Sequence, residues 1–250
     1  MKSLKDTGLL FQRHFTQQLR NPTWLFVGLS SPVLYLALFT PLLKHFTRAA
    51  STGAVLDSFF PGILALLAFA SGTAQGFGTI FEKSGVIERL RVTPASRFAI
   101  LSGPLVSAMT FMYFFDAIAV AVAHGFGFQI HWAGLLVLAV LIGVFMVMMS
   151  AWSVAMALTP KEIDAFASVM NGLNLPTLLL AGVLLPISLG PTWMRVVAHF
   201  DPLYYVVEGA RALGAGAFSS DHVWQAFAVI VPLLVLVLGW ATSVFKKAVA

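Results

Sequence analysis

The sequence predicts an all-α integral membrane protein with six transmembrane helices. The chain has 250 residues, of which 59% are hydrophobic and only 10% are charged, whereas soluble proteins carry charge on about a quarter of their residues. Its apolar residues form runs long enough to cross a bilayer. Most Lys and Arg residues flank these runs, so the net charge of +5 does not indicate nucleic-acid binding.

Residues 1–23 predict an amphipathic helix that lies in the membrane interface. One helical stripe carries Leu4, Gly8, Phe11, Phe15 and Leu19, and charged residues lie opposite. A cleaved signal peptide is the alternative, but no small-residue cleavage site follows the apolar run. We therefore predict an uncleaved first span over residues 24–43 and a single transmembrane domain over residues 24–250.

The remaining predicted spans cover residues 59–81, 98–123, 132–158, 165–185 and 224–245, with a polar loop over residues 44–57. In the second span, Gly72 and Gly76 have the spacing of a close helix contact, although a chance match is an equal alternative. In the fourth span, we interpret the cluster of methionines as a packing surface.

Polar residues within the predicted spans are candidates for a transport pathway. Asp116 lies well inside the third span, where a carboxylate faces protein or water; a buried hydrogen bond to a neighbouring helix is the structural alternative. Residues 171–176, which include Asn171, Asn174 and Pro176, are expected to interrupt the fifth span. That span is therefore the least suited to face lipid on all sides.

Between the last two spans, the sequence predicts two short helices in the interface or dipping into it. Asp201 and Pro202 form a helix start, with a capping residue followed by proline at the first helical position. Trp193, Tyr204 and Tyr205 suit the headgroup level, and we expect the two helices to open or close the outer exit, with a static re-entrant plug as the alternative. Glu208 and Arg211 share one helical face, so they are expected to pair locally or across a dimer axis.

The segment over residues 82–97 is short and polar and lies between two long apolar runs, so it must lie in water at one membrane face. Its pattern predicts a short amphipathic helix, in which Val86 and Leu90 lie apart from the charged Glu88, Arg89 and Arg91. From these residues alone, an anchor loop that only sets the orientation remains the alternative.

This segment resembles the loop after the second membrane helix of ABC-2 type permeases, closest to their drug-resistance (daunorubicin-exporter-like) branch. The resemblance implies a coupling helix that docks on a separate ATP-hydrolysing subunit and includes Glu82, Gly85, Glu88, Arg89, Leu90, Arg91 and Pro94. The block from Leu179 to Tyr205 is similar to the same family, in which the paired short helices close the outer end of the pathway. The family more often has Asn where this chain has Asp201.

Charge asymmetry predicts the orientation of the chain. Six spans place both termini on one side, and 11 of the 15 Lys and Arg residues then fall on that side. The positive-inside rule therefore predicts that both termini and residues 82–97 face the cytoplasm of a cell (inner or plasma) membrane.

The sequence carries no signature of an enzyme. No Lys follows a Gly, so the chain lacks a phosphate-binding loop, and ATP and Mg are expected on the partner subunit. It also lacks cysteine and a zinc-protease motif, and we predict no metal site and no catalytic residue.

The expected function is the permease subunit of an exporter for a hydrophobic or amphipathic compound, assembled with an ATPase and with either a second permease copy or a related permease chain. A secondary transporter or channel is the main alternative, but no internal repeat with matching broken helices is visible. An intramembrane enzyme would need a partner for Asp116, and none is evident.

Overall fold

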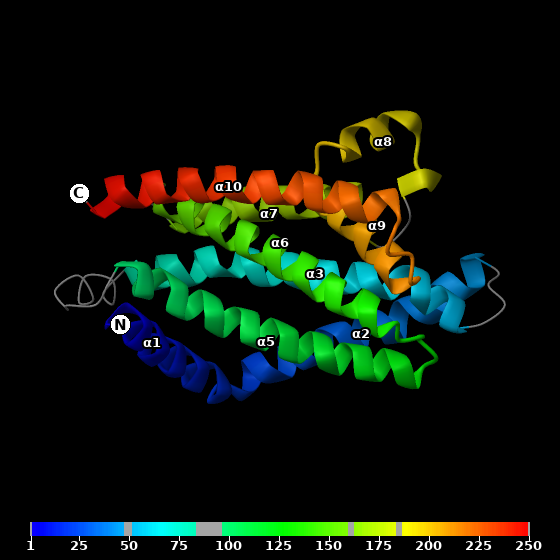
Figure 1. The fold of residues 1–250 in the computed structure, drawn as a ribbon, viewed down its shortest axis with the longest axis horizontal. Helices are drawn as coiled ribbons and strands as arrows, with labels where there is room; N and C mark the ends of the chain where they lie inside the picture. The colour runs from blue at the N-terminus through cyan, green and yellow to red at the C-terminus, as the bar shows by residue number, and fades with distance from the viewer. Residues whose placement is uncertain (1, 48–51, 84–96, 160–162, 184–186, 250) are drawn as a thin grey trace.

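The computed structural model describes residues 2–47, 52–83, 97–159, 163–183 and 187–249. This part of the chain is helical, without strands. Its helices, in chain order, are α1 (Lys2–Leu19), α2 (Pro22–Thr47), α3 (Thr52–Lys83), α5 (Arg97–Gly125), α6 (Trp132–Leu158), α7 (Ile163–Leu180), η1 (Ile187–Leu189), α8 (Thr192–Ala198), α9 (Pro202–Gly214) and α10 (Asp221–Val249). The long helices run along one bundle, and both termini lie at the end where α3 finishes and α5 begins (Figure 1).

Five of the described helices are long and apolar enough to cross a membrane, namely α2, α3, α5, α6 and α10. Together with the helical fold, this identifies a multi-pass membrane protein. The helix α7 is not among the five. Six crossings therefore stay a prediction.

The predicted bounds of the polar loop, residues 44–57, are wrong, because α2 continues to Thr47 and α3 already begins at Thr52. The reason is that the first turns of α3 have an apolar face, with Val55 and Leu56 buried in the core. Asp57 does not interrupt this helix, because its carboxylate accepts a hydrogen bond from the backbone N–H of Gln129 at 3.1 Å.

The predicted interruption of the fifth span is also wrong, because α7 is one continuous helix through residues 171–176. Proline inside a helix removes one backbone hydrogen bond without necessarily ending the helix. Asn171 and Asn174 lie on exposed positions of α7. The chain turns only after Leu180, where Gly182 adopts a φ of +68°.

The helix α1 packs along α5, so it has a protein partner in addition to any membrane contact. The rings of Phe11 and Phe15 stack at 5.4 Å, and Phe15 stacks on Phe111 of α5 at 4.8 Å. The hydroxyl groups of Thr7 and Ser102 lie 3.2 Å apart. Phe15 of the predicted stripe therefore faces α5, while placement of α1 in a membrane interface stays a prediction.

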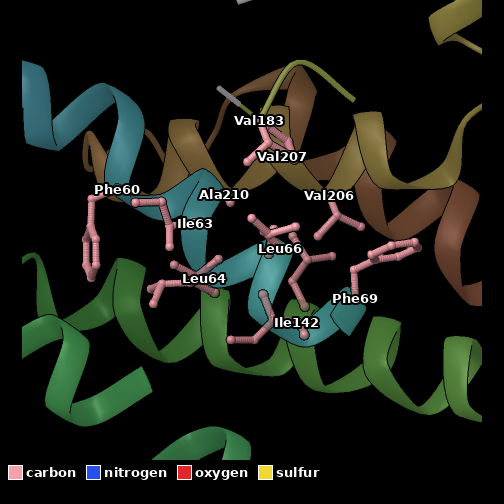
Figure 2. Packing of buried hydrophobic residues seen from close by; sticks show 14 of the residues in the cluster. Phe60, Ile63, Leu64, Leu66, Phe69, Ile142, Val183, Val206, Val207 and Ala210 are labelled. Carbon is pink, nitrogen blue, oxygen red and sulfur yellow. The ribbon is translucent and has the colours of Figure 1, made fainter. Parts of the chain in front are cut away.

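The helix α3 lies at the centre of the core. Its buried side chains, including Phe60, Ile63 and Leu64, pack between α6 on one side and α9 on the other. Figure 2 shows this arrangement, with Ile142 of α6 facing α3 from one side and Val207 of α9 from the other. Such mutual burial of apolar side chains fixes how α9 sits within the bundle.

Two glycines of α3 allow it to approach α6 closely, which confirms the predicted contact at Gly72 and Gly76. A methyl group on Gly72 would meet Met149 and the backbone of α6, and one on Gly76 would meet Ser153 and the ring of Phe166. Ser153 fastens this contact, because its hydroxyl donates to the carbonyl of Thr73 at 2.6 Å and accepts from the N–H of Gly76 at 3.1 Å.

Replacing Gly76 with Ala is expected to lower the free energy of unfolding by about 1–3 kcal/mol, because overpacking forces the helices apart. Gly78→Ala is the matched control on the same helix, since nothing lies within 4 Å of a methyl group there. Thermal unfolding of both variants in detergent tests this. Equal unfolding temperatures for the two variants would contradict the close contact.

Candidate functional site

The helix α9 begins where the sequence predicts, at Asp201 and Pro202. Asp201 is the N-cap, and its Oδ1 accepts a hydrogen bond from the N–H of Leu203 at 2.9 Å. Pro202 occupies the first turn, where its missing N–H costs nothing. These two residues therefore fix the start of a helix that runs into the core, with Leu203, Val206 and Val207 buried.

The two short helices have different environments. The helix α8 lies at the margin of the molecule, whereas α9 lies within the bundle (Figure 1). Trp193 of α8 is 66% exposed, and Phe200, which follows α8, is 85% exposed. Tyr204 and Tyr205 are half-buried, and the Tyr205 hydroxyl donates to the carbonyl of His199 at 3.0 Å. The depth of these side chains in a membrane stays a prediction, and so does the opening or closing of an exit by α8 and α9. A movement of α9 would have to expose apolar side chains that are buried in the core.

Arg211 holds α9 to two other segments of the chain. Its guanidinium pairs with Glu208 at 2.8 Å and donates to the carbonyl of Ser58 at 3.1 Å and to that of Gly182 at 2.6 Å. The predicted pairing of Glu208 and Arg211 is therefore local. Burial lowers the pKa of Arg211, and the negative charge of Glu208 opposes that shift. The cluster joins the start of α3, the turn after α7 and the middle of α9.

Arg211→Met is expected to reduce the free energy of unfolding by about 2–4 kcal/mol, because it leaves Glu208 without its partner and removes the hydrogen bonds to the carbonyls of Ser58, Gly182 and Val183. Arg195→Met is the control, since Arg195 is exposed and, among the described residues, its guanidinium donates only to Thr192, at 3.4 Å. Both variants can be compared by thermal unfolding. A loss as small as that of the control would show that the Arg211 cluster contributes little.

A cavity of about 270 Å³ lies between α3, α6, α7, α9 and α10. Most of its lining is apolar, aromatic or sulfur-containing, with a few polar side chains from α3, α7 and the start of α9. The lining residues are Phe69, Thr73, Phe77, Phe145, Met148, Met149, Trp152, Met170, Asn171, Leu173, Asn174, Thr177, Asp201, Pro202, Leu203, Leu233 and Val237. A mostly apolar cavity with a few fixed polar groups is typical of a small-molecule site.

The cavity brings together four of the residues that the sequence selected: Asn171, Asn174, Asp201 and Pro202. It does not include Trp193, Tyr204, Tyr205, Glu208 or Arg211. Sequence reasoning missed the walls from α3 and α10, whose residue types are those of any membrane helix. The methionine cluster was the one available signal, because Met148 and Met149 line the cavity, whereas Met146 is packed in the core.

Asp116 lies on α5 and is outside the cavity. Its side chain is 5% exposed, and its carboxylate oxygens accept no hydrogen bond from the described residues. The alternative of a buried hydrogen bond to a neighbouring helix is therefore not observed there. Among the residues that the structure describes, no group of three His, Cys, Asp or Glu side chains could hold a metal ion.

The predicted coupling residues are mostly outside the described ranges. Glu82 lies in the last turn of α3. The other six, which are Gly85, Glu88, Arg89, Leu90, Arg91 and Pro94, fall within residues 84–96, so their conformation and their contacts stay predictions.

Comparison with known proteins identifies the family of this bundle. The family model described as "ABC-2 type transporter" matches residues 5–213. The chain belongs to the ABC-2 type transporter family. This ABC-2 chain is also similar to proteins whose names describe them as the transport permease ycf38. It is 31% identical over 217 residues to the one from Cyanophora paradoxa, which covers 84% of this chain and 74% of the relative.

The same ABC-2 chain is 28% identical over 218 residues to the ycf38 protein of Porphyra purpurea, covering 83% of this chain and 73% of the relative. It is also 28% identical over 228 residues to that of Pyropia yezoensis, covering 84% of this chain and 74% of the relative. The family match spans α1 to α9, and so includes most of the cavity lining but not the α10 wall.

Proposed function

We propose that this chain is the transmembrane permease subunit of an ATP-binding cassette exporter that moves hydrophobic or amphipathic compounds out of the cytoplasm or the inner leaflet. The observation that carries the proposal is the cavity between α3, α6, α7, α9 and α10, whose walls suit such a compound. Membership of the ABC-2 family and the naming of the relatives as transport permeases support the transport role.

Occupation of the cavity during transport is tested by filling it. Asn174→Trp places a bulky side chain on a lining position, and Leu175→Trp is the matched control on the exposed, non-lining side of α7. The measurement is ATP-dependent export of the neutral dye N-phenyl-1-naphthylamine from vesicles that contain the permease and its ATPase. We expect Asn174→Trp to reduce export several-fold and Leu175→Trp to leave it near the wild-type rate. Equal rates would contradict the proposed pathway.

Energy is supplied in this proposal by a separate ATPase that docks on residues 82–97 from the cytoplasm, as the sequence resemblance implies. The charge asymmetry of the sequence supports this orientation. The orientation is tested with Gly85→Cys, which places a single cysteine in a chain that has none of its own. In the proposed orientation, an impermeant maleimide does not label this cysteine in intact cells. Labelling of that cysteine by an impermeant maleimide in intact cells would contradict it.

A second permease copy completes the pathway in this proposal. Asn171 and Asn174 lie at exposed positions of the single chain. Polar side chains inside a membrane favour contact with protein or water over lipid. Native mass spectrometry of the active complex is expected to show two permease chains with the ATPase. An active complex that holds one permease chain would contradict the dimer.

A further inference from the structure

The described residues that line the cavity carry charge of one sign only. They include one ionisable acid, Asp201, and no Lys, Arg or His. The other polar side chains of the lining are neutral: Thr73, Asn171, Asn174 and Thr177. Around them lie the aromatic rings of Phe69, Phe77, Phe145 and Trp152 and three methionine thioethers. Aromatic faces attract cations, so the lining favours positive charge in two ways.

The two oxygens of the Asp201 carboxylate have different roles. Oδ1 caps α9 by accepting the N–H of Leu203, whereas Oδ2 is buried and accepts no hydrogen bond from the described residues. The residue as a whole is 8% exposed. A cap needs one acceptor oxygen, and Asn provides it as well as Asp does. The fold therefore accounts for Oδ1 and leaves the negative charge of the second oxygen unexplained.

That charge is costly in the structure as it stands. Burial raises the pKa of Asp201 to about 6, although the hydrogen bond from Leu203 opposes this shift. The carboxylate is consequently ionised at neutral pH without a cationic partner among the lining residues. A buried charge of this kind becomes favourable only when an opposite charge lies close to it.

We propose that this cavity selects lipophilic cations, with the Asp201 carboxylate as their counter-charge and the surrounding aromatic rings as their apolar contact surface. This inference rests on the proposed function, because it assigns a substrate class to the same site. Neutral compounds of similar size bind through the apolar walls alone. Anionic amphiphiles bind poorly, because the carboxylate repels them and no basic side chain of the lining receives them.

The pH dependence of the selectivity follows from the groups around Asp201. The lining side chains of α3, α6, α7 and α10 contain no titratable group. Near Asp201 in sequence are His199, whose Nδ1 lies 2.7 Å from the carbonyl of Arg195, and Tyr204, whose pKa is raised by burial. The nearest charged pair on α9 is Glu208 with Arg211, which neutralise each other. Protonation of Asp201 below about pH 6 removes the counter-charge, so the preference for cations should be lost as the pH falls.

The test measures binding of three dyes to the full chain in phosphatidylcholine nanodiscs, with empty nanodiscs subtracted. Ethidium is a permanent cation, N-phenyl-1-naphthylamine is neutral, and 8-anilinonaphthalene-1-sulfonate is an anionic derivative of that neutral dye. At pH 7.5 the wild type should bind ethidium more tightly than the neutral dye, and the anionic dye most weakly. Ethidium binding that is no tighter than that of the neutral dye would overturn the inference.

Asp201→Asn keeps the helix cap and removes the charge, and Asp201→Ser is a second variant that does the same with a hydroxyl. In either variant the ratio of ethidium to neutral-dye affinity should fall about tenfold or more, because charges close together in a partly buried site attract strongly. The wild-type ratio should also fall between pH 7.5 and pH 4.5, whereas the variant ratio should stay constant. If the folded variants keep the wild-type ratio of ethidium to neutral-dye affinity, the inference is overturned.

Failure of the cavity itself is distinguishable from failure of its charge selectivity. Asn174→Trp should weaken binding of ethidium and of the neutral dye together, relative to Leu175→Trp. If it weakens neither, the cavity is not the binding site, and both the proposed pathway and the cation inference fail. If it weakens both while the Asp201 variants keep the wild-type ratio, the cavity stands and only the charge inference fails.

Discussion

The close contact between α3 and α6 is the constraint on which the rest of the bundle depends. Gly72 and Gly76 let the two backbones approach, and the hydroxyl of Ser153 bonds to α3 through both a donor and an acceptor. Within a membrane, packing and interhelical hydrogen bonds replace much of the hydrophobic drive that holds soluble helices together. The same stretch of α3 supplies Phe69, Thr73 and Phe77 to the cavity, so the contact that holds the bundle also sets one wall of the site.

The helix α9 is fixed at both of its ends by polar groups inside an otherwise apolar bundle. Asp201 caps its beginning, and the Arg211 cluster ties its later turns to α3 and to the turn after α7. Between these anchors, its apolar side chains complete the core. The hydrogen bonds of these groups add orientation to packing, because each hydrogen bond has a direction. The helix α8 has no comparable set of described contacts and lies at the margin.

The sequence predicted the fold well wherever one local signal was sufficient. A single long apolar run predicted α6 over residues 132–158, and a cap followed by proline predicted the start of α9. The sequence-based prediction failed at Thr52, where burial of the apolar face of α3 outweighed the polar residues nearby. It also failed at Pro176, where α7 continues as a helix through an exposed, proline-containing stretch. Asn171, Asn174 and Asp201 were selected because polarity is rare in such helices. Their meeting in one cavity, with walls of ordinary apolar residues, depends on helix packing that no local pattern encodes.

The exposed position of α7 has a consequence for how a compound reaches the cavity. Leu173 and Asn174 line the cavity and are also exposed at the edge of the single chain, so in the proposed exporter a lipophilic compound would enter from the lipid wherever the second permease copy leaves this edge uncovered. The bilayer then acts as its reservoir, and the relevant concentration is the one dissolved in the membrane. Affinities calculated from the concentration in bulk water would therefore vary with the partition coefficient of each compound. They would also change with the amount of lipid, although the protein is unchanged.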